Sequence, residues 1–166
     1  MSKFILIGMS GSGKTTVGKA AAEKTGLKFI DIDEEIERKH GKISRIFNES
    51  GEEQFREYES KEFESALSYD NTVVSTGGGI LGKPENRKLA SSGTVIFIDR
   101  DLDCIKMSLD DSNRPMVKNK PGMLEKLYKE RYGLYKDTMD FMVSNNGTRT
   151  ECIDAVVALI NGKRNS

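Results

Sequence analysis

The sequence predicts an α/β domain of three layers, in which helices cover both faces of a central, mostly five-stranded parallel sheet. Short apolar runs alternate with longer segments of helical pattern, which is typical of βαβ units. The runs are almost continuously apolar, so the strands are expected to be buried on both faces. With 166 residues, the chain suits a single domain, residues 1–166, around one core.

The expected strands are, in chain order, Phe4–Ile7, Lys28–Ile32, Thr72–Ser75, Thr94–Asp99 and a weaker Phe141–Ser144.

Helices are expected after most of these strands. An alanine-rich stretch favours a helix over Lys14–Lys24, and Gly26 is suited to the left-handed residue that ends it. Ser50 followed by Glu53 has the spacing of a capping box, which predicts a helix start there and a helix reaching about Ala66.

The second half of the chain carries fewer signals. Pro84 and Pro121 each stand where a first helical turn would begin. The final run Cys152–Ile160 is apolar enough to dock on the sheet. Residues 110–120 are polar, lack apolar periodicity and contain Arg114-Pro115. Such a segment is either a disordered loop or a mobile lid. We favour the second interpretation, a lid that closes above the bound phosphates.

The first strand leads directly into a phosphate-binding motif. Gly8–Thr15 match the P-loop pattern G-x-x-x-x-G-K-S/T at every position, between an apolar strand and a helix former. The glycines let backbone N–H groups turn toward phosphates, and the helix N-terminus adds its positive dipole end. Lys14 would reach the β- and γ-phosphates, and Thr15 would ligate Mg²⁺. The expected ATP contacts here are Gly11, Ser12, Gly13, Lys14, Thr15 and Thr16.

The remaining sequence narrows the class of P-loop protein. A GTPase would be expected to carry an N-K-x-D motif, and this chain has none. Motors and large ATPases generally need a longer chain. Small size, the second threonine at Thr16 and the lid-like segment favour a metabolite kinase with a nucleoside monophosphate kinase-like fold.

Further motifs resemble those of the shikimate kinase family in their fixed order and cover about Phe4 to Ser144. They are Thr15-Thr16-Val17-Gly18, Asp31-Ile32-Asp33, Ile36-Glu37, Gly41, Ile46-Phe47, Gly51-Glu52, Phe55-Arg56, Glu59, Gly77-Gly78-Gly79, Arg114-Pro115 and Arg131-Tyr132-Gly133-Leu134-Tyr135. The resemblance implies transfer of the γ-phosphoryl group of Mg-ATP to the 3-hydroxyl of shikimate, in aromatic amino-acid (chorismate) biosynthesis.

The two aspartates are assigned to the metal and the acceptor. Alternation on a strand would send the side chains of Asp31 and Asp33 to opposite faces. The resemblance assigns Asp31 to the magnesium shell through water, beside Thr15, and Asp33 to the reacting hydroxyl. From Asp33, both orientation and partial deprotonation of that hydroxyl remain open.

The acceptor's carboxylate is assigned to arginines. Arg56 and Glu59 are spaced i, i+3 and share one helix face. By resemblance Arg56 binds the carboxylate, Glu59 holds that arginine or a ring hydroxyl, and Arg131 adds a second guanidinium. The guanidinium fork donates two parallel hydrogen bonds to a carboxylate. Gly77–Gly79 would let the backbone approach the substrate closely.

The nucleotide side is less complete. Arg114 on the lid would neutralise charge on the transferring phosphate, and it joins Asp33 and Lys14 as the expected catalytic set. Family members often carry an arginine that packs on adenine where Met107 stands here. Residues 145–150 take the place of the family's adenine loop, with Thr148 and Arg149 as the expected contacts. Gly133 replaces a proline of the family motif.

Strand Thr94–Asp99 ends in Asp99-Arg100, which we interpret as a strand-end turn.

Composition limits the partners. Lys plus Arg total 26 and Asp plus Glu total 26, so no overall field draws the chain to nucleic acid or a membrane. Phe4–Gly8 is too short for a signal-peptide core or a membrane span. A cytoplasmic monomer acting on shikimate and ATP is expected, with Cys104 and Cys152 as free thiols. The single His40 excludes multi-histidine metal sites.

Two other readings remain open. Another metabolite kinase, for gluconate or a nucleoside monophosphate, would share the P-loop but lack the combination of paired arginines and three glycines. A nucleotide-dependent switch would hydrolyse ATP slowly and act through a protein partner.

Overall fold

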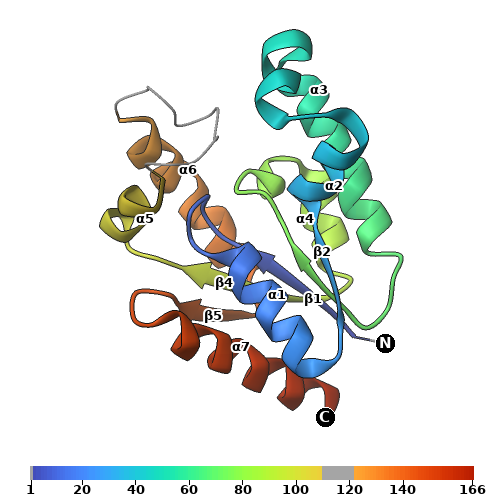
Figure 1. Cartoon of the computed structure of the whole chain (residues 1–166), viewed down its shortest axis with the longest axis vertical. Coiled ribbons are helices and arrows are strands. Elements are labelled where there is room, and N and C mark those ends of the chain that lie inside the picture. The colour runs from blue at the N-terminus through green and yellow to red at the C-terminus, as the bar shows by residue number, and fades with distance from the viewer. Residues whose placement is uncertain (1, 110–121) are drawn as a thin grey trace.

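The computed structural model describes residues 2–109 and 122–166, and its centre is one parallel sheet (Figure 1). The strands are β1 (Lys3–Ile7), β2 (Lys28–Asp31), β3 (Thr72–Ser75), β4 (Thr94–Asp99) and β5 (Phe141–Ser144). Their order is β2-β3-β1-β4-β5, and every neighbouring pair is parallel. The predicted five-stranded α/β fold is confirmed.

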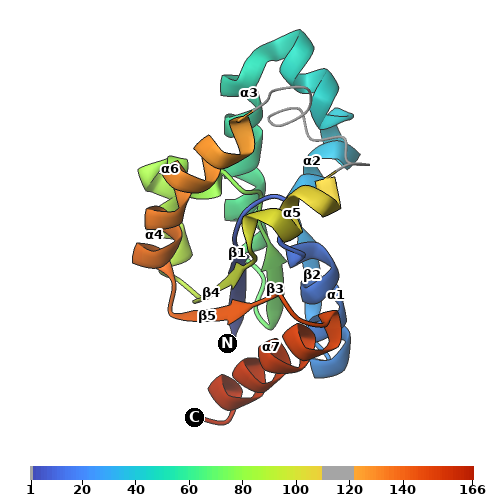
Figure 2. The same ribbon diagram turned by 90° about the vertical axis from the view of Figure 1, so that its left-hand side faces the viewer.

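Helices form the outer two layers. They are α1 (Lys14–Thr25), α2 (Ile32–His40), α3 (Ile43–Ala66), α4 (Pro84–Ala90), α5 (Leu102–Leu109), α6 (Met123–Thr138) and α7 (Arg149–Arg164), with a short 3₁₀ helix at Ile80–Gly82. Figures 1 and 2 show α1 and α7 side by side on one face of the sheet, with α4 and α6 on the other. Helices α2 and α3 extend beyond the carboxyl edge of the strands.

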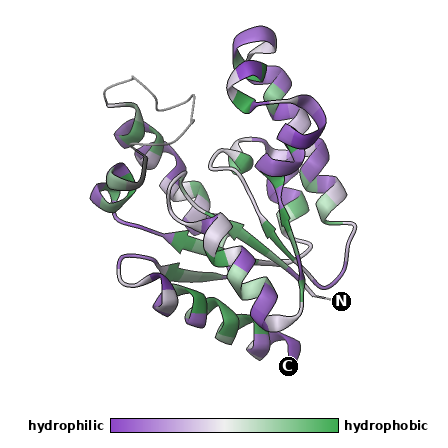
Figure 3. Cartoon of the chain, in the orientation of Figure 1, coloured by the Kyte–Doolittle hydropathy of each residue, from purple (hydrophilic) through white to green (hydrophobic). Residues whose placement is uncertain are grey.

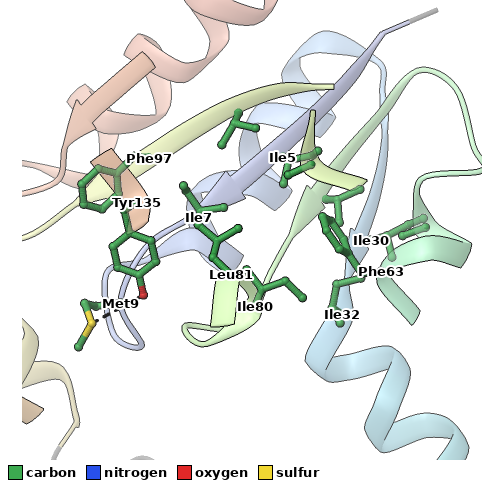
Figure 4. Close-up of a cluster of buried hydrophobic side chains, with 14 of the residues drawn as sticks. Ile5, Ile7, Met9, Ile30, Ile32, Phe63, Ile80, Leu81, Phe97 and Tyr135 are labelled. Atoms are coloured by element: carbon green, nitrogen blue, oxygen red, sulfur yellow. Dashed lines mark hydrogen bonds between the residues drawn. The ribbon is translucent and has the colours of Figure 1, made fainter. Parts of the chain in front are cut away.

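Each face of the sheet has its own core, as β1 illustrates. Ile5 and Ile7 join a buried cluster with residues of α3 and α6, including Phe63 (Figure 4). Phe4 and Leu6 join a second cluster with α1 and α7. Both sets of side chains are at most 1% exposed, which explains why β1 is continuously apolar. The edge strands β2 and β5 are partly exposed, so the expected burial on both faces is wrong for them. Figure 3 shows the hydrophobic strands between more polar helices.

Helix α1 lies very close to the sheet at Gly18. A Cβ atom added there would lie 2.8 Å from Leu6 Cδ1 and 2.9 Å from Phe29 Cε1. We expect Gly18→Ala to lower the free energy of unfolding by about 1–3 kcal/mol through overpacking, measured by urea denaturation. The control is Gly133→Ala in α6, where an added Cβ meets nothing within 4 Å. An unchanged unfolding midpoint in Gly18→Ala would contradict this packing.

The end of β2 differs from the prediction. The strand stops at Asp31, whose Oδ1 accepts a hydrogen bond from the Glu34 backbone N–H at 3.0 Å and caps α2. Asp33 therefore lies in the first helical turn, and the expected strand alternation of Asp31 and Asp33 is wrong. Capping stabilises the helix start because it satisfies an otherwise unpaired N–H group.

The long helix α3 also differs. It begins at Ile43, before the predicted start at Ser50. Gly51, at φ 84° and ψ 169°, interrupts the helical backbone, so the predicted start coincides with a kink between two helical segments. The expected left-handed cap at Gly26 and the first-turn position of Pro84 are confirmed.

Two predicted features cannot be located. Pro121 and the expected lid at residues 110–120, including Arg114, lie outside the described residues.

Within 2–109 and 122–166, no helix has both the length and the apolar character needed to cross a membrane.

Candidate active site

A cavity of about 610 Å³ opens at the carboxyl edge of the sheet, where ligands bind in open α/β folds. It collects residues that follow β1, β2, β3 and β4 along the chain. The predicted site residues that line it are Gly11, Gly13, Lys14, Thr15, Thr16, Asp31, Asp33, Arg56, Glu59, Gly77, Gly78, Gly79, Arg131 and Arg149. Segments far apart in the sequence thus form one polar chamber.

The P-loop forms the nucleotide end of this chamber. Gly8, Gly11 and Gly13 all have positive φ, at 148°, 85° and 97°. A Cβ on Gly8 would lie 2.4 Å from the Ile98 carbonyl oxygen. Glycine at Gly8 therefore permits both the backbone turn and the close approach of β1 to the end of β4.

Lys14 points its ammonium group into the loop. Its Nζ donates to the carbonyl oxygens of Gly8 at 2.6 Å and Met9 at 2.9 Å, and the side chain is buried. A buried cation requires acceptors around it. Phosphate oxygens entering the loop would offer such acceptors with a full negative charge.

Thr15 and Asp31 provide a pair of oxygens beside the loop. The Thr15 hydroxyl donates to Asp31 Oδ2 at 2.5 Å. Mg²⁺ prefers oxygen ligands and takes only one or two from protein when phosphates and waters supply the rest. In the described part of the chain no cluster of three or more His, Cys, Asp or Glu could hold a metal alone. The Thr15–Asp31 pair fits a magnesium ion carried in with a nucleotide.

Glu59 organises the opposite end of the chamber. Its Oε1 accepts from Arg56 Nη1 at 2.8 Å, and the side chain is 1% exposed. Burial raises the pKa of Glu59, and the positive charges of Arg56 and Arg131 oppose that rise. Its Oε2 has no hydrogen-bond partner among the described residues and would lie 2.7 Å from a Cβ on Gly77.

Two guanidinium groups converge on the glycines after β3. A Cβ on Gly79 would lie 2.7 Å from both terminal nitrogens of Arg56 and 2.9 Å from Arg131 Nη2. A Cβ on Gly78 would lie 3.0 Å from Arg131 Nη1. The absence of side chains at these glycines therefore lets two forked cations share one pocket wall, an arrangement suited to a carboxylate.

Tyr135 holds this glycine segment through a hydrogen bond to its backbone. Its buried hydroxyl donates to the Gly78 carbonyl oxygen at 2.5 Å, and Figure 4 shows it beside Met9. Burial raises the pKa of Tyr135, so the hydroxyl keeps the proton that this bond requires.

Comparison with known families identifies the family of this chain. Residues 10–161 match the family model described as "Shikimate kinase". The chain belongs to the shikimate kinase family.

Similar shikimate kinases match nearly the whole chain. That of Clostridium botulinum (strain Alaska E43 / Type E3) is 43% identical, over 96% of this chain and 97% of the relative. That of Persephonella marina is 42% identical, over 89% of this chain and 91% of the relative. The family is one of ATP-dependent kinases.

Solved structures agree. The chain superposes on a shikimate kinase from Acinetobacter baumannii in complex with shikimate with a TM-score of 0.91 and 31% identity, covering 98% of this chain and 94% of that one. A gluconokinase from Sinorhizobium meliloti gives a TM-score of 0.59 at 18% identity, over 98% and 95% of the two chains. The second likeness shows a shared fold alone.

Some predicted nucleotide contacts lie elsewhere. The Thr148 hydroxyl accepts from the Glu151 backbone N–H at 3.1 Å as the cap of α7, and Thr148 is outside the cavity lining, unlike Arg149. Ser12 is 1% exposed and also outside that lining. Met107, at the family's arginine position, is 80% exposed. Contacts of Thr148 and Ser12 with nucleotide remain predictions.

Two residues near the P-loop were not predicted as site residues. Arg100 lines the cavity and donates to the Gly11 carbonyl oxygen, so the strand-end turn proposed for it is also part of the cavity wall. Asn145 donates to the Ser12 carbonyl oxygen. Their contacts with the P-loop were not predicted, because each donates to a backbone carbonyl distant in sequence.

Proposed function

We propose that this chain transfers the γ-phosphoryl group of ATP to the 3-hydroxyl of shikimate, giving shikimate 3-phosphate and ADP. The observation that carries the proposal is one cavity with a P-loop at one end and a convergent arginine pair at the other. A phosphate donor and a carboxylate-bearing acceptor are thereby brought together, as in-line transfer requires.

The acceptor end would hold shikimate by its carboxylate. Arg56 and Arg131 would donate paired hydrogen bonds to that group, with Glu59 keeping Arg56 in place through their 2.8 Å bond. The backbone of Gly77–Gly79 would lie against the ring. This leaves a ring hydroxyl to face Asp33, which lines the same cavity.

Asp33 would act on the nucleophile. From the first turn of α2 its carboxylate would accept the hydroxyl proton or fix the hydroxyl in line with the γ-phosphate. The P-loop N–H groups and Lys14 would hold the phosphates. Mg²⁺, bound by Thr15 and through water by Asp31, would supply neutralisation of phosphate charge. Arg114, outside the described residues, would add a further cation.

The wider setting is part of the proposal. The chain would act in aromatic amino-acid (chorismate) biosynthesis in the cytoplasm, as a monomer of one domain. Its partners would be shikimate and ATP, with no nucleic acid or membrane. The balance of 26 basic and 26 acidic residues supports this, since it produces no strong overall field.

The test is a coupled assay of ADP release with Mg-ATP and shikimate, run beside gluconate and AMP. We expect turnover that requires shikimate, because AMP has no carboxylate for the paired arginines and the open chain of gluconate lacks a rigid ring to fix one hydroxyl near Asp33. Equal or greater turnover with gluconate or AMP would reject the acceptor assignment.

Arg131→Ala is expected to weaken shikimate binding by about 1.5–3 kcal/mol, the range for hydrogen bonds to charged groups. The ATP KM should change little, because Arg131 belongs to the acceptor end. Titration calorimetry with shikimate measures the effect. The matched control is Arg45→Ala, an exposed arginine paired with Glu49 outside the cavity. Wild-type shikimate affinity in Arg131→Ala would remove this residue from the site.

A further inference from the structure

Two successive carbonyl groups of the P-loop are held from outside by side chains of other elements. The Gly11 carbonyl oxygen accepts from Arg100 Nη1 at 3.0 Å. The Ser12 carbonyl oxygen accepts from Asn145 Nδ2 at 2.8 Å. These bonds span 89 and 133 residues of sequence, so they tie the loop to the far part of the sheet.

The two donors lie at the ends of two neighbouring, paired strands. Arg100 directly follows β4 and Asn145 directly follows β5. The Asn145 backbone N–H donates to the Asp99 carbonyl oxygen at 2.7 Å, which continues the β4–β5 pairing by one more bond. Asn145 is 8% exposed. The ends of two paired strands therefore fix where both donors lie.

Holding a carbonyl also fixes the N–H of the same peptide. The described chain contains no cis peptide, and in a trans peptide the N–H points opposite to the C=O. With the Ser12 carbonyl turned toward Asn145, the Gly13 N–H points the opposite way, away from Asn145. The peptide after Gly11 is fixed at both ends, because the Ser12 N–H also donates to the Met9 carbonyl oxygen at 3.1 Å.

The fit at this point is close. A Cβ on Gly13 would lie 2.5 Å from Asn145 Nδ2, so the amide occupies the space beside the glycine. A phosphate site made of backbone N–H groups works only if those groups already point inward. Each peptide that must be turned on binding would lower the nucleotide affinity.

We propose that Asn145 and Arg100 are positioning residues of the nucleotide site. Asn145 orients the Gly13 N–H for phosphate, and Arg100 holds the adjoining turn, which the Ser12 N–H closes on the Met9 carbonyl oxygen, before nucleotide arrives. This inference rests on the proposed function as an ATP-dependent kinase. It requires no contact between either side chain and the transferred phosphoryl group.

The first test compares Asn145→Asp with Asn161→Asp by titration calorimetry with Mg-ADP. Asn145→Asp keeps the shape but replaces the donor with an oxygen facing the Ser12 carbonyl, and we expect ADP affinity to fall about tenfold or more. Asn161→Asp makes the same substitution at an exposed position of α7, outside the cavity lining. It should bind ADP nearly as the wild type does. Shikimate affinity should be unchanged in both variants.

Asn145→Ala removes the donor without adding charge. It replaces Asn145→Asp in the same binding measurement if the aspartate variant does not fold. We expect its ADP affinity to fall about fivefold or more, as for a buried acceptor left unpaired. Wild-type ADP affinity in a folded Asn145 variant, or an equal loss in Asn161→Asp, would overturn the inference alone. A wild-type protein that binds no ADP would instead overturn the proposed function.

Arg100 needs a measurement that separates position from charge. In Arg100→Met without nucleotide, we expect the Ser12 amide to exchange its hydrogen about tenfold faster by NMR, because its peptide is released. Removing a nearby cation alone would slow base-catalysed exchange, since less hydroxide is attracted. Unchanged or slower exchange at Ser12 would contradict a positioning role for Arg100.

Discussion

Asp33→Asn is expected to lower kcat by about 10²-fold or more, the usual contribution of a positioned general base. The amide keeps the size of the carboxylate and can still contact the hydroxyl, but it cannot accept a proton. Asp33 lies in the chamber, and a Cβ on Gly77 would lie 3.2 Å from its Oδ1. The loss should therefore fall on kcat, with shikimate affinity changing less. Steady-state kinetics in both substrates measure the two effects.

The matched control for Asp33 is Glu35→Gln. Glu35 lies on the same helix, pairs with Arg38 at 2.6 Å and is outside the cavity lining. Glu35→Gln removes the same charge as Asp33→Asn but lies outside the proposed site, so kcat should stay near the wild-type value. A wild-type kcat in Asp33→Asn would remove Asp33 from the chemistry and leave orientation by other groups as the explanation.

Lys14→Met is expected to lower kcat by about 10³-fold, in the upper range for loss of one preorganised charge-stabilising donor. Methionine retains an apolar stem of similar length but has no cation for the β- and γ-phosphates. The ATP KM should rise as well, because the ground-state phosphates lose the same contact. Initial rates over a range of Mg-ATP concentrations measure both parameters.

Folding must be separated from chemistry in this variant, since Lys14 also bonds the Gly8 and Met9 carbonyl oxygens. Thermal unfolding and shikimate binding would show whether the acceptor end remains formed. Lys19→Met, an exposed lysine further along α1, is the control for loss of charge. Turnover close to the wild type in folded Lys14→Met would contradict the role given to the P-loop lysine.

The central strands β1, β3 and β4 were predictable because they are buried on both faces. The edge strand β5 is partly exposed, with Met142 at 47%, which agrees with the weaker signal of its sequence. Thr72–Ser75, Thr94–Asp99 and Phe141–Ser144 occur at the predicted bounds, since each is a short, mostly apolar run between polar segments. The end of β2 was predicted wrongly, because Asp31-Ile32-Asp33 has the alternation of a strand. The helix there begins with a cap between Asp31 and the Glu34 backbone N–H. The prediction gave more weight to the alternation than to this capping signal.

The candidate site was predictable where a motif describes it. The P-loop, the paired arginines and the glycines after β3 do line one cavity. Arg100 and Asn145 could not be predicted as neighbours of the loop, because each donates to a backbone carbonyl. Any residue type offers a carbonyl, so no sequence pattern marks the acceptor, and only the folded sheet brings the donors to it.

The most direct test of the central claim is the identity of the phosphorylated product. The chain would be incubated with Mg-ATP and shikimate, and the products followed by phosphorus and proton NMR. The account predicts ADP and shikimate phosphorylated at the 3-hydroxyl in equal amounts, with phosphorus coupled to the ring proton at that carbon. Free inorganic phosphate without a phosphate ester of shikimate, or phosphate on a different hydroxyl, would contradict it.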